Sequence, residues 1–154
     1  MEPQKIRILF VDDEEHNLIS FKATFRTRYK IETAIGGLEA IEKLKNLEFD
    51  IIITDQRMPR MTGVEFLEQI IQTHPDPVRI LLTGYTDMAA VIDAINKGKI
   101  FHYLTKPWNE EELDSTIQKA YQLYLEKKKM KDENQLLSIT NEQLEFLLRQ
   151  KLLS

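Results

Sequence analysis

Short apolar runs alternate with amphipathic segments along the first two thirds of the chain. The runs are rich in Ile, Val and Leu, and in the segments between them apolar residues recur every three or four positions. Short apolar runs are typical of buried strands, and the longer period is typical of helices that cover a sheet. We expect strands at residues 6–11, 29–34, 50–54, 78–83 and 100–104, and helices near 14–28, 38–47, 64–71 and 88–95.

This order of elements predicts the fold class. A strand followed by a helix, repeated five times, indicates an α/β protein with a doubly wound five-stranded parallel sheet and helices on both faces. The run Ile51–Ile53 has three consecutive β-branched residues before Thr54 and Asp55. Such a continuous apolar run is typical of a central strand that is buried on both sides.

A long segment without proline or glycine, residues 109–153, follows the last predicted strand. Asn109 is a suitable cap residue for a helix that starts there. Further along, apolar residues repeat every seven positions, and assigning them to heptad position d places mostly polar residues at position a, which favours a dimer in one register. The d residues are Leu123, Met130, Leu137 and Leu144, and the a residues are Lys127, Asn134, Asn141 and Leu148.

We therefore divide the chain into a sheet domain, residues 1–125, and a C-terminal helical extension, residues 126–154, that forms a dimeric coiled coil. A continuous helix of ~40 residues would be ~60 Å long, so its distal half is expected to leave the domain. Two alternatives stay open. The terminal helix could fold back or fray, and the capping-box pattern at Thr140–Gln143 could start a separate helix.

Composition narrows the classes of protein. The 154 residues include no cysteine, which excludes disulfides and thiolate chemistry, and the net charge of −4 is not typical of a nucleic-acid binder. The basic run Lys127–Lys131 is interpreted as a solvated helix face, because acidic and polar residues resume at Asp132. No apolar run approaches the ~18 residues of a membrane span, and we expect a cytoplasmic protein.

Chemically active side chains follow several of the predicted strands. Because parallel strands end at one edge of a sheet, where open α/β proteins bind ligands, these side chains should meet there. Three carboxylates in one cleft would repel each other without a nearby cation, and all-oxygen ligands suit Mg²⁺. On its own, the run Asp12–Glu15 would indicate only acidic residues at a helix start. The side chains in question are Asp12 and Asp13, Asp55, Thr83 and Lys106.

Four short motifs follow one another along the chain: Val11–Glu14, Ile53–Gly63, Leu82–Gly84 and Tyr103–Pro107. In this order and at this spacing they resemble the receiver domains of bacterial two-component response regulators, and the resemblance covers about residues 5–125. It implies the flavodoxin-like (βα)5 receiver fold, here with an extended C-terminal helix. The segment Ile95–Trp108 resembles receivers found beside cyclic-di-GMP phosphodiesterase domains and in some transcription activators, although no such output domain is recognisable in these 154 residues.

The resemblance implies a role for each matching residue. Asp55 would be the phosphoacceptor, with Thr83 and Lys106 holding phosphoryl oxygens. Mg²⁺ would be bound directly by Asp13 and Asp55, through water by Asp12, and by the backbone carbonyl of Arg57. Thr83 and Tyr103 would form the switch that reports phosphorylation. The Lys106–Pro107 bond would be cis. Arg57 and Tyr85 are large and stand two residues after Asp55 and Thr83, so we expect them to flank the phosphoryl group and slow its hydrolysis, with solvated loop side chains as the alternative.

The predicted function is a phosphorylation-dependent response regulator of a two-component phosphorelay. It would accept its phosphoryl group from a sensor histidine kinase or a phosphotransfer protein and act as a homodimer through the C-terminal helix. Its own chemistry would be limited to Mg²⁺-dependent self-phosphorylation and autodephosphorylation. One alternative is a metal-dependent phosphohydrolase that forms an aspartyl-phosphate, although Arg57 stands where such an enzyme needs a second acid. Another is the receiver fragment of a longer regulator.

Overall fold

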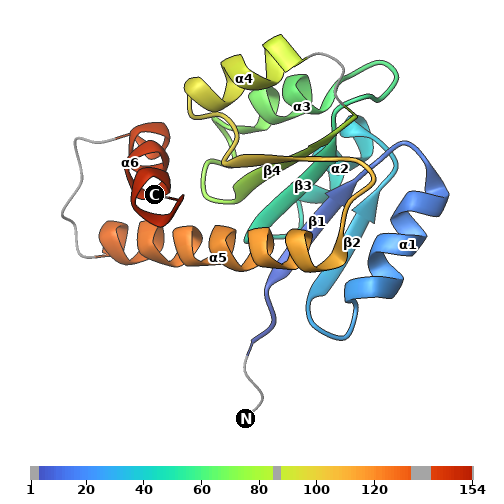
Figure 1. Cartoon of the computed structure of the whole chain (residues 1–154), viewed down its shortest axis with the longest axis horizontal. Coiled ribbons are helices and arrows are strands. Elements are labelled where there is room, and N and C mark those ends of the chain that lie inside the picture. The colour runs from blue at the N-terminus through green and yellow to red at the C-terminus, as the bar shows by residue number, and fades with distance from the viewer. Residues whose placement is uncertain (1–3, 85–87, 133–139, 154) are drawn as a thin grey trace.

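The computed structural model describes residues 4–84, 88–132 and 140–153 and has the predicted alternation of strands and helices (Figure 1). The strands are β1 (Arg7–Val11), β2 (Lys30–Ala34), β3 (Ile51–Asp55), β4 (Val78–Thr83) and β5 (His102–Thr105). The helices are α1 (Glu15–Phe25), α2 (Gly37–Leu44), α3 (Gly63–Ile70), α4 (Met88–Asn96), α5 (Glu110–Asp132) and α6 (Asn141–Leu153). The last strand begins two residues later than predicted, at His102.

The strands form one parallel sheet in the order β2-β1-β3-β4-β5. The doubly wound five-stranded sheet predicted from the sequence is therefore confirmed. The strand β3 lies in the centre, and all five of its residues are buried. Asp55 is its last residue and pairs with Leu82 of β4, so it stands at the carboxyl edge of the sheet.

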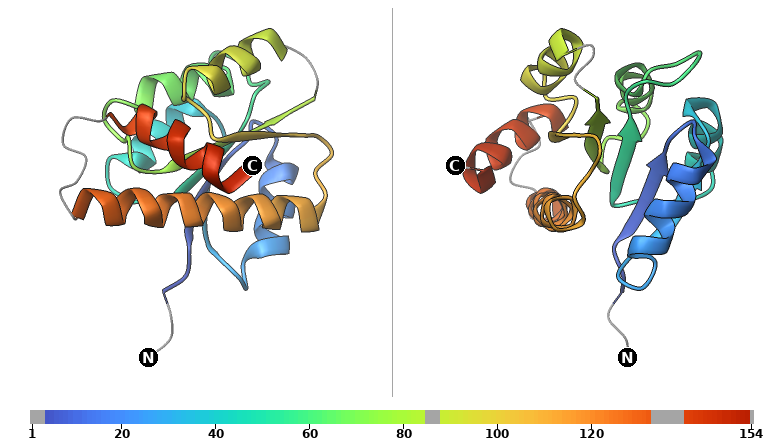
Figure 2. Two further views of the ribbon diagram at one scale, coloured as in Figure 1. Left: turned by 60° about the vertical axis from the view of Figure 1, so that its left-hand side comes forward. Right: turned by 45° about the vertical axis from the view of Figure 1, so that its right-hand side comes forward.

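Helices cover both faces of the sheet and form two hydrophobic clusters (Figures 1 and 2). Because side chains alternate along a strand, Ile8 and Phe10 of β1 join one cluster and Leu9 and Val11 join the other. The first cluster includes residues of α1, α5 and α6, and the second includes residues of α2, α3 and α4. Trp108, two residues before α5, packs beside Phe21 and Phe25 of α1.

The C-terminal segment differs from the single helix that the sequence predicts. The helix α5 ends at Asp132, and α6 lies back against α5 and the sheet domain (Figure 2). At its start the Thr140 hydroxyl accepts a hydrogen bond from the Gln143 amide at 3.2 Å, and the Gln143 side chain accepts one from the Thr140 amide at 3.0 Å. This capping box confirms the alternative of a separate helix.

The expectation that the distal half of one long helix leaves the domain is therefore wrong for residues 141–153. Leu144 and Leu148 are buried in the first cluster because the apolar stripe of α6 meets α5 and the sheet domain of the same chain. The predicted heptad residues Asn134 and Leu137 lie outside the described residues. The dimeric coiled coil stays a prediction. No helix in the described part of the chain is both long and apolar enough to cross a membrane.

Candidate functional site

Three aspartates meet at the carboxyl edge of the sheet. Asp12 and Asp13 follow β1, and Asp55 ends β3. Each offers a carboxylate oxygen, and these three oxygens lie within 4.8 Å of one another. Asp12 and Asp55 are buried, whereas Asp13 is partly exposed. The structure thus brings together the acidic residues that the sequence predicts for one cleft.

Lys106 supplies a positive charge to this cluster. Its Nζ lies 3.2 Å from Asp12 Oδ2 and 3.3 Å from Asp55 Oδ1. The Lys106–Pro107 peptide bond is cis, as predicted, and the Lys106 amide donates to the Thr83 carbonyl at 2.9 Å. Burial favours the neutral amine, but the Asp55 and Asp12 carboxylates raise the pKa of Lys106 above its ordinary value.

The cleft holds more negative charge than Lys106 can balance. Burial raises the pKa of Asp55, Lys106 lowers it, and the neighbouring Asp12 and Asp13 raise it further, with a net rise above the ordinary value. Burial and the neighbouring carboxylates therefore oppose the charge on Asp55, and a bound cation would relieve this repulsion. Clustered carboxylate oxygens are the donor set that hard divalent cations such as Mg²⁺ take. The residues present therefore fit a Mg²⁺ site.

One backbone amide and one side chain, that of Asn17, hold Asp12 in place, and the sequence analysis did not single out Asn17. The Glu14 amide donates to Asp12 Oδ1 at 2.9 Å, and the Asn17 side-chain amide donates to Asp12 Oδ2 at 3.2 Å. Asn17 lies on the first turns of α1, so the helix start and the acidic cluster form one unit. In the sequence, the feature that could have indicated this role is the position of Asn17, five residues after Asp12.

The loop after β3 is shaped by close backbone packing. The Gln56 side chain is buried and accepts a hydrogen bond from the Val64 amide at 2.9 Å, which ties the end of β3 to the start of α3. A Cβ atom on Gly63 would lie only 2.4 Å from the Asp55 carbonyl oxygen. Gly63 is therefore needed for the close approach of α3 to the strand that carries Asp55.

The other predicted residues surround this cluster. Thr83 is buried at the end of β4, beside Thr105 of β5, and Tyr103 is partly buried against the second hydrophobic cluster. Arg57 is exposed, and Tyr85 lies outside the described residues. An open cleft of about 600 Å³ lies over the acidic residues. It is lined by Asp13, Glu14, Asp55, Arg57, Met58, Pro59, Gly84 and Lys106.

Comparison with known proteins agrees with this geometry. The family model of the response regulator receiver domain matches residues 8–118. The chain is 38% identical over 120 residues to the hydrogenase transcriptional regulatory protein HoxA of Bradyrhizobium diazoefficiens, a match that covers 76% of this chain and 24% of that protein. It thus spans about a quarter of the length of the curated relatives it matches.

Several solved structures are similar along most of the chain. An adenylate cyclase structure from Rhodopirellula baltica is 29% identical, with a TM-score of 0.80, and covers 85% of this chain and 98% of its own. The signal receiver domain of an HD domain-containing protein from Pseudomonas fluorescens Pf-5 is 31% identical, with a TM-score of 0.77, covering 84% and 96%. The response regulator TrrA of Thermotoga maritima, in complex with Mg(2+)-BeF, is 31% identical, with a TM-score of 0.67, covering 75% and 98%.

Proposed function

Because the chain belongs to the response regulator receiver domain family, we propose that it is a phosphorylation-dependent switch with Asp55 as the phosphoacceptor. Receiver domains are typically signalling modules of two-component systems. The phosphoryl donor would be a phosphohistidine of a sensor histidine kinase or of a phosphotransfer protein in the cytoplasm. The observation that carries the proposal is the position of Asp55, which ends the central strand within 4.8 Å of Asp12 and Asp13 and 3.3 Å from Lys106.

The acidic residues would also hold a divalent cation. Asp13 and Asp55 would bind Mg²⁺ directly, Asp12 would act through water, and the Arg57 backbone carbonyl would complete the set. Bound Mg²⁺ would neutralise the carboxylates and the charge of the incoming phosphoryl oxygens. The similar TrrA structure was solved as a complex with Mg(2+)-BeF.

Phosphoryl transfer needs mainly positioning and charge neutralisation. An ionised Asp55 oxygen would form a bond to phosphorus as the P–N bond of the donor breaks, and the electron pair of that bond would return to the imidazole nitrogen. Lys106 already lies near Asp55 Oδ1 and would pair with a phosphoryl oxygen. The Thr83 hydroxyl would hold another.

The switch would run from Thr83 to Tyr103. Thr83 ends β4 and Tyr103 lies on the neighbouring β5, paired with Leu81. Movement of Thr83 toward a phosphoryl group would leave space that the Tyr103 ring can enter, and this would change the surface formed by β5 and the helices beside it. Arg57 would shield the phosphoryl group from water.

The C-terminal segment would carry the output. We keep the division into a receiver domain, residues 1–125, and an extension, residues 126–154, that forms a homodimeric coiled coil. Residues 95–108 resemble receivers beside cyclic-di-GMP phosphodiesterases and in some transcription activators. The similar proteins include both the receiver of an HD domain-containing protein and the transcriptional regulator HoxA, so both classes of longer regulator stay open as the context of this receiver.

Intact-mass measurement tests the phosphoacceptor. The protein would be incubated with Mg²⁺ and a small phosphodonor, next to the Asp55→Asn variant and a sample with a chelator. We expect a gain of about 80 Da, one phosphoryl group, only for the unmodified sequence with Mg²⁺. The same gain in Asp55→Asn would contradict the assignment. Rapid release of inorganic phosphate without accumulation of the adduct would favour the phosphohydrolase instead.

A further inference from the structure

The C-terminal helix carries an apolar stripe that the structure buries within one chain. In the predicted heptad, Leu144 is at position d and Leu148 at position a, and both are 4% exposed. On α5 the heptad positions Lys127 and Met130 lie beside this region, with Lys127 2% exposed. We name Lys127, Met130, Leu144 and Leu148 the heptad seam. The residues that a coiled coil would use are the residues that hold α6 against its own domain.

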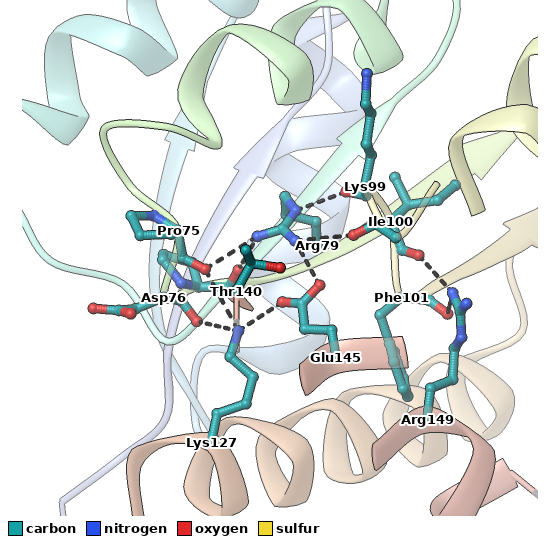
Figure 3. A network of polar contacts seen from close by, with 12 residues as sticks. Pro75, Asp76, Arg79, Lys99, Ile100, Phe101, Lys127, Thr140, Glu145 and Arg149 are labelled. Carbon is teal, nitrogen blue, oxygen red and sulfur yellow. Dashed lines mark hydrogen bonds and ion pairs between the residues drawn. The ribbon is translucent and has the colours of Figure 1, made fainter. Parts of the chain in front are cut away.

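A buried ion network fixes α6 in this position (Figure 3). Glu145 accepts a hydrogen bond from Arg79 of β4 at 2.5 Å and another from Lys127 of α5 at 2.6 Å. All three side chains are nearly fully buried. The remaining donors of Arg79 reach the carbonyls of Lys99 and Pro77, at 2.7 Å and 2.8 Å. The network therefore joins β4, α5 and α6 through a single carboxylate.

A second contact joins α6 to the segment before β5. The Arg149 guanidinium donates to the carbonyls of Ile100 at 2.9 Å and Ile95 at 3.1 Å (Figure 3 shows Arg149 beside residues 100 and 101). Gly98 lies in the same segment, and a Cβ atom on it would be 3.5 Å from the Glu142 Cβ atom. The helix α6 thus lies over the end of α4, the start of β5 and α5.

Docking of α6 removes charged side chains from water, which is energetically unfavourable. Two cations and one carboxylate leave water together, and burial lowers the pKa of Lys127 below its ordinary value despite the nearby Glu145. The desolvation of a buried ion pair offsets much of its Coulomb attraction, so such pairs add little net stability. They are specific instead, because removing the Glu145 carboxylate leaves two buried cations without their shared counter-charge. A change that removes or reverses this one charge is therefore expected to release α6 from the docked position.

We infer that the heptad seam is an interaction surface for a second copy of this chain, and that docked α6 and the dimeric coiled coil are mutually exclusive uses of it. This deepens the proposed dimeric output. Charge favours the second copy as the occupant. In a parallel coiled coil, Glu126 at position g would face Lys131 at position e of the partner helix, and the symmetric pair would repeat. In the docked state Lys131 is instead paired with Asp76 at 2.5 Å.

The register provides variants that separate the two states. Glu145 is at position e and Arg149 at position b, so both hold α6 in the docked state but lie outside the seam. Glu145→Lys places a third cation beside Arg79 and Lys127, and Arg149→Gln weakens the contacts to Ile95 and Ile100. Glu142→Lys, at position b on the same helix, changes charge equally outside the ion network and is the matched control.

Sedimentation equilibrium would measure self-association of the 154-residue chain, without a phosphodonor and with a chelator. Under these conditions Asp55 is not phosphorylated, so a negative result would count against this inference and not against Asp55 as the phosphoacceptor. We expect Glu145→Lys and Arg149→Gln to lower the dimer dissociation constant by about tenfold or more. In these variants fewer chains have α6 docked, so a larger fraction of chains can form the dimer.

Glu142→Lys should match the unmodified chain. Adding Leu148→Asp to Glu145→Lys should restore the monomer. Unchanged association in folded Glu145→Lys and Arg149→Gln, or a dimer that Leu148→Asp leaves intact, would each overturn the inference.

Discussion

At the scale of single residues, the charge on Asp55 is costly to the fold because burial and the neighbouring Asp12 and Asp13 oppose it. In the presence of a chelator we expect Asp55→Asn to be more stable than the unmodified chain by about 1 kcal/mol, or roughly 2–4 °C in Tm for a chain of this size. Added Mg²⁺ should raise the Tm of the unmodified chain more than that of the variant. Thermal melts with chelator and with Mg²⁺ measure both effects.

The control for this prediction is Asp93→Asn. Asp93 pairs with Lys97 at 2.9 Å on the surface of α4, with both side chains 60% exposed. Exposed ion pairs contribute little to stability, so its Tm should stay close to that of the unmodified chain in both conditions. A lower Tm for Asp55→Asn than for Asp93→Asn in chelator would show that repulsion in the acidic cluster does not destabilise the fold.

Tyr29, the residue before β2, provides a pH-dependent link to α5. Its hydroxyl donates to Asp114 and accepts a hydrogen bond from Gln118 at 2.8 Å, and burial together with the Asp114 bond raises its pKa to about 12. The unfolded chain loses this proton near pH 10, so folding free energy should weaken as the pH rises from about 10 to about 12, by roughly 1–2 kcal/mol. Tyr29→Phe should lack this component in denaturant titrations across that range, and equal slopes would contradict it.

At the scale of elements, the contact between α3 and β3 leaves no space at Gly63. A Cβ atom there would lie 2.4 Å from the Asp55 carbonyl oxygen and 2.8 Å from Leu81 Cδ1. We expect Gly63→Ala to destabilise the fold by about 1–3 kcal/mol, because backbone must shift to relieve the overlap. Chemical denaturation measures the loss.

Gly37→Ala is the matched control, since Gly37 also begins a helix. The nearest atom to its added Cβ would be the Sδ of Met61 at 2.6 Å, which belongs to a flexible side chain that can move. The control should cost less than Gly63→Ala, and an equal cost for the two variants would refute the backbone overlap as the cause.

The sequence predicted the sheet and the acidic cleft because both follow from local patterns. Apolar β-branched runs identify strands, and the carboxyl ends of parallel strands bring Asp12, Asp55 and Lys106 together wherever the helices begin and end. The residues that hold the cleft in place were harder to identify from the sequence. Asn17 and Gln56 act through single hydrogen bonds, and a single hydrogen bond leaves no periodic pattern in the sequence.

The position of α6 was not predictable from its pattern. Leu144 and Leu148 form an apolar stripe that can be buried by a second chain or by the same one, and the sequence period is equal in both cases. Lys127, interpreted as part of a solvated run, is buried because Glu145 reaches it from another helix. One residue in the sequence could have indicated this contact. Arg79 is a lone cation inside the apolar strand Val78–Thr83, and a buried cation requires a counter-charge.

At the scale of the whole molecule, the proposed phosphorylation site and the C-terminal helix meet through β5. This strand carries Tyr103, and Arg149 of α6 holds the carbonyl of Ile100, just before the strand begins. Under the proposed switch, Tyr103 moves toward the acidic cleft after phosphorylation. We therefore expect phosphorylation to weaken the docking of α6. Amide hydrogen exchange of residues 141–153 should become faster when Mg²⁺ and a small phosphodonor are added, and should not change in Asp55→Asn or Tyr103→Ala.

Thermodynamic linkage makes this coupling reciprocal. If phosphorylation favours undocked α6, then undocking α6 must favour phosphorylation by the same free energy. With a small phosphodonor, and after correction for each variant's rate of autodephosphorylation, Glu145→Lys should therefore hold a larger phosphorylated fraction than Glu142→Lys. Glu145 contacts Arg79 and Lys127 and is not among the residues that line the cleft over Asp55. Equal fractions in these two variants, together with unchanged exchange of α6 in fully phosphorylated protein, would show that the two sites are independent. A matched rise in both measurements would instead show that the two sites are coupled, as the proposed route through β5 requires.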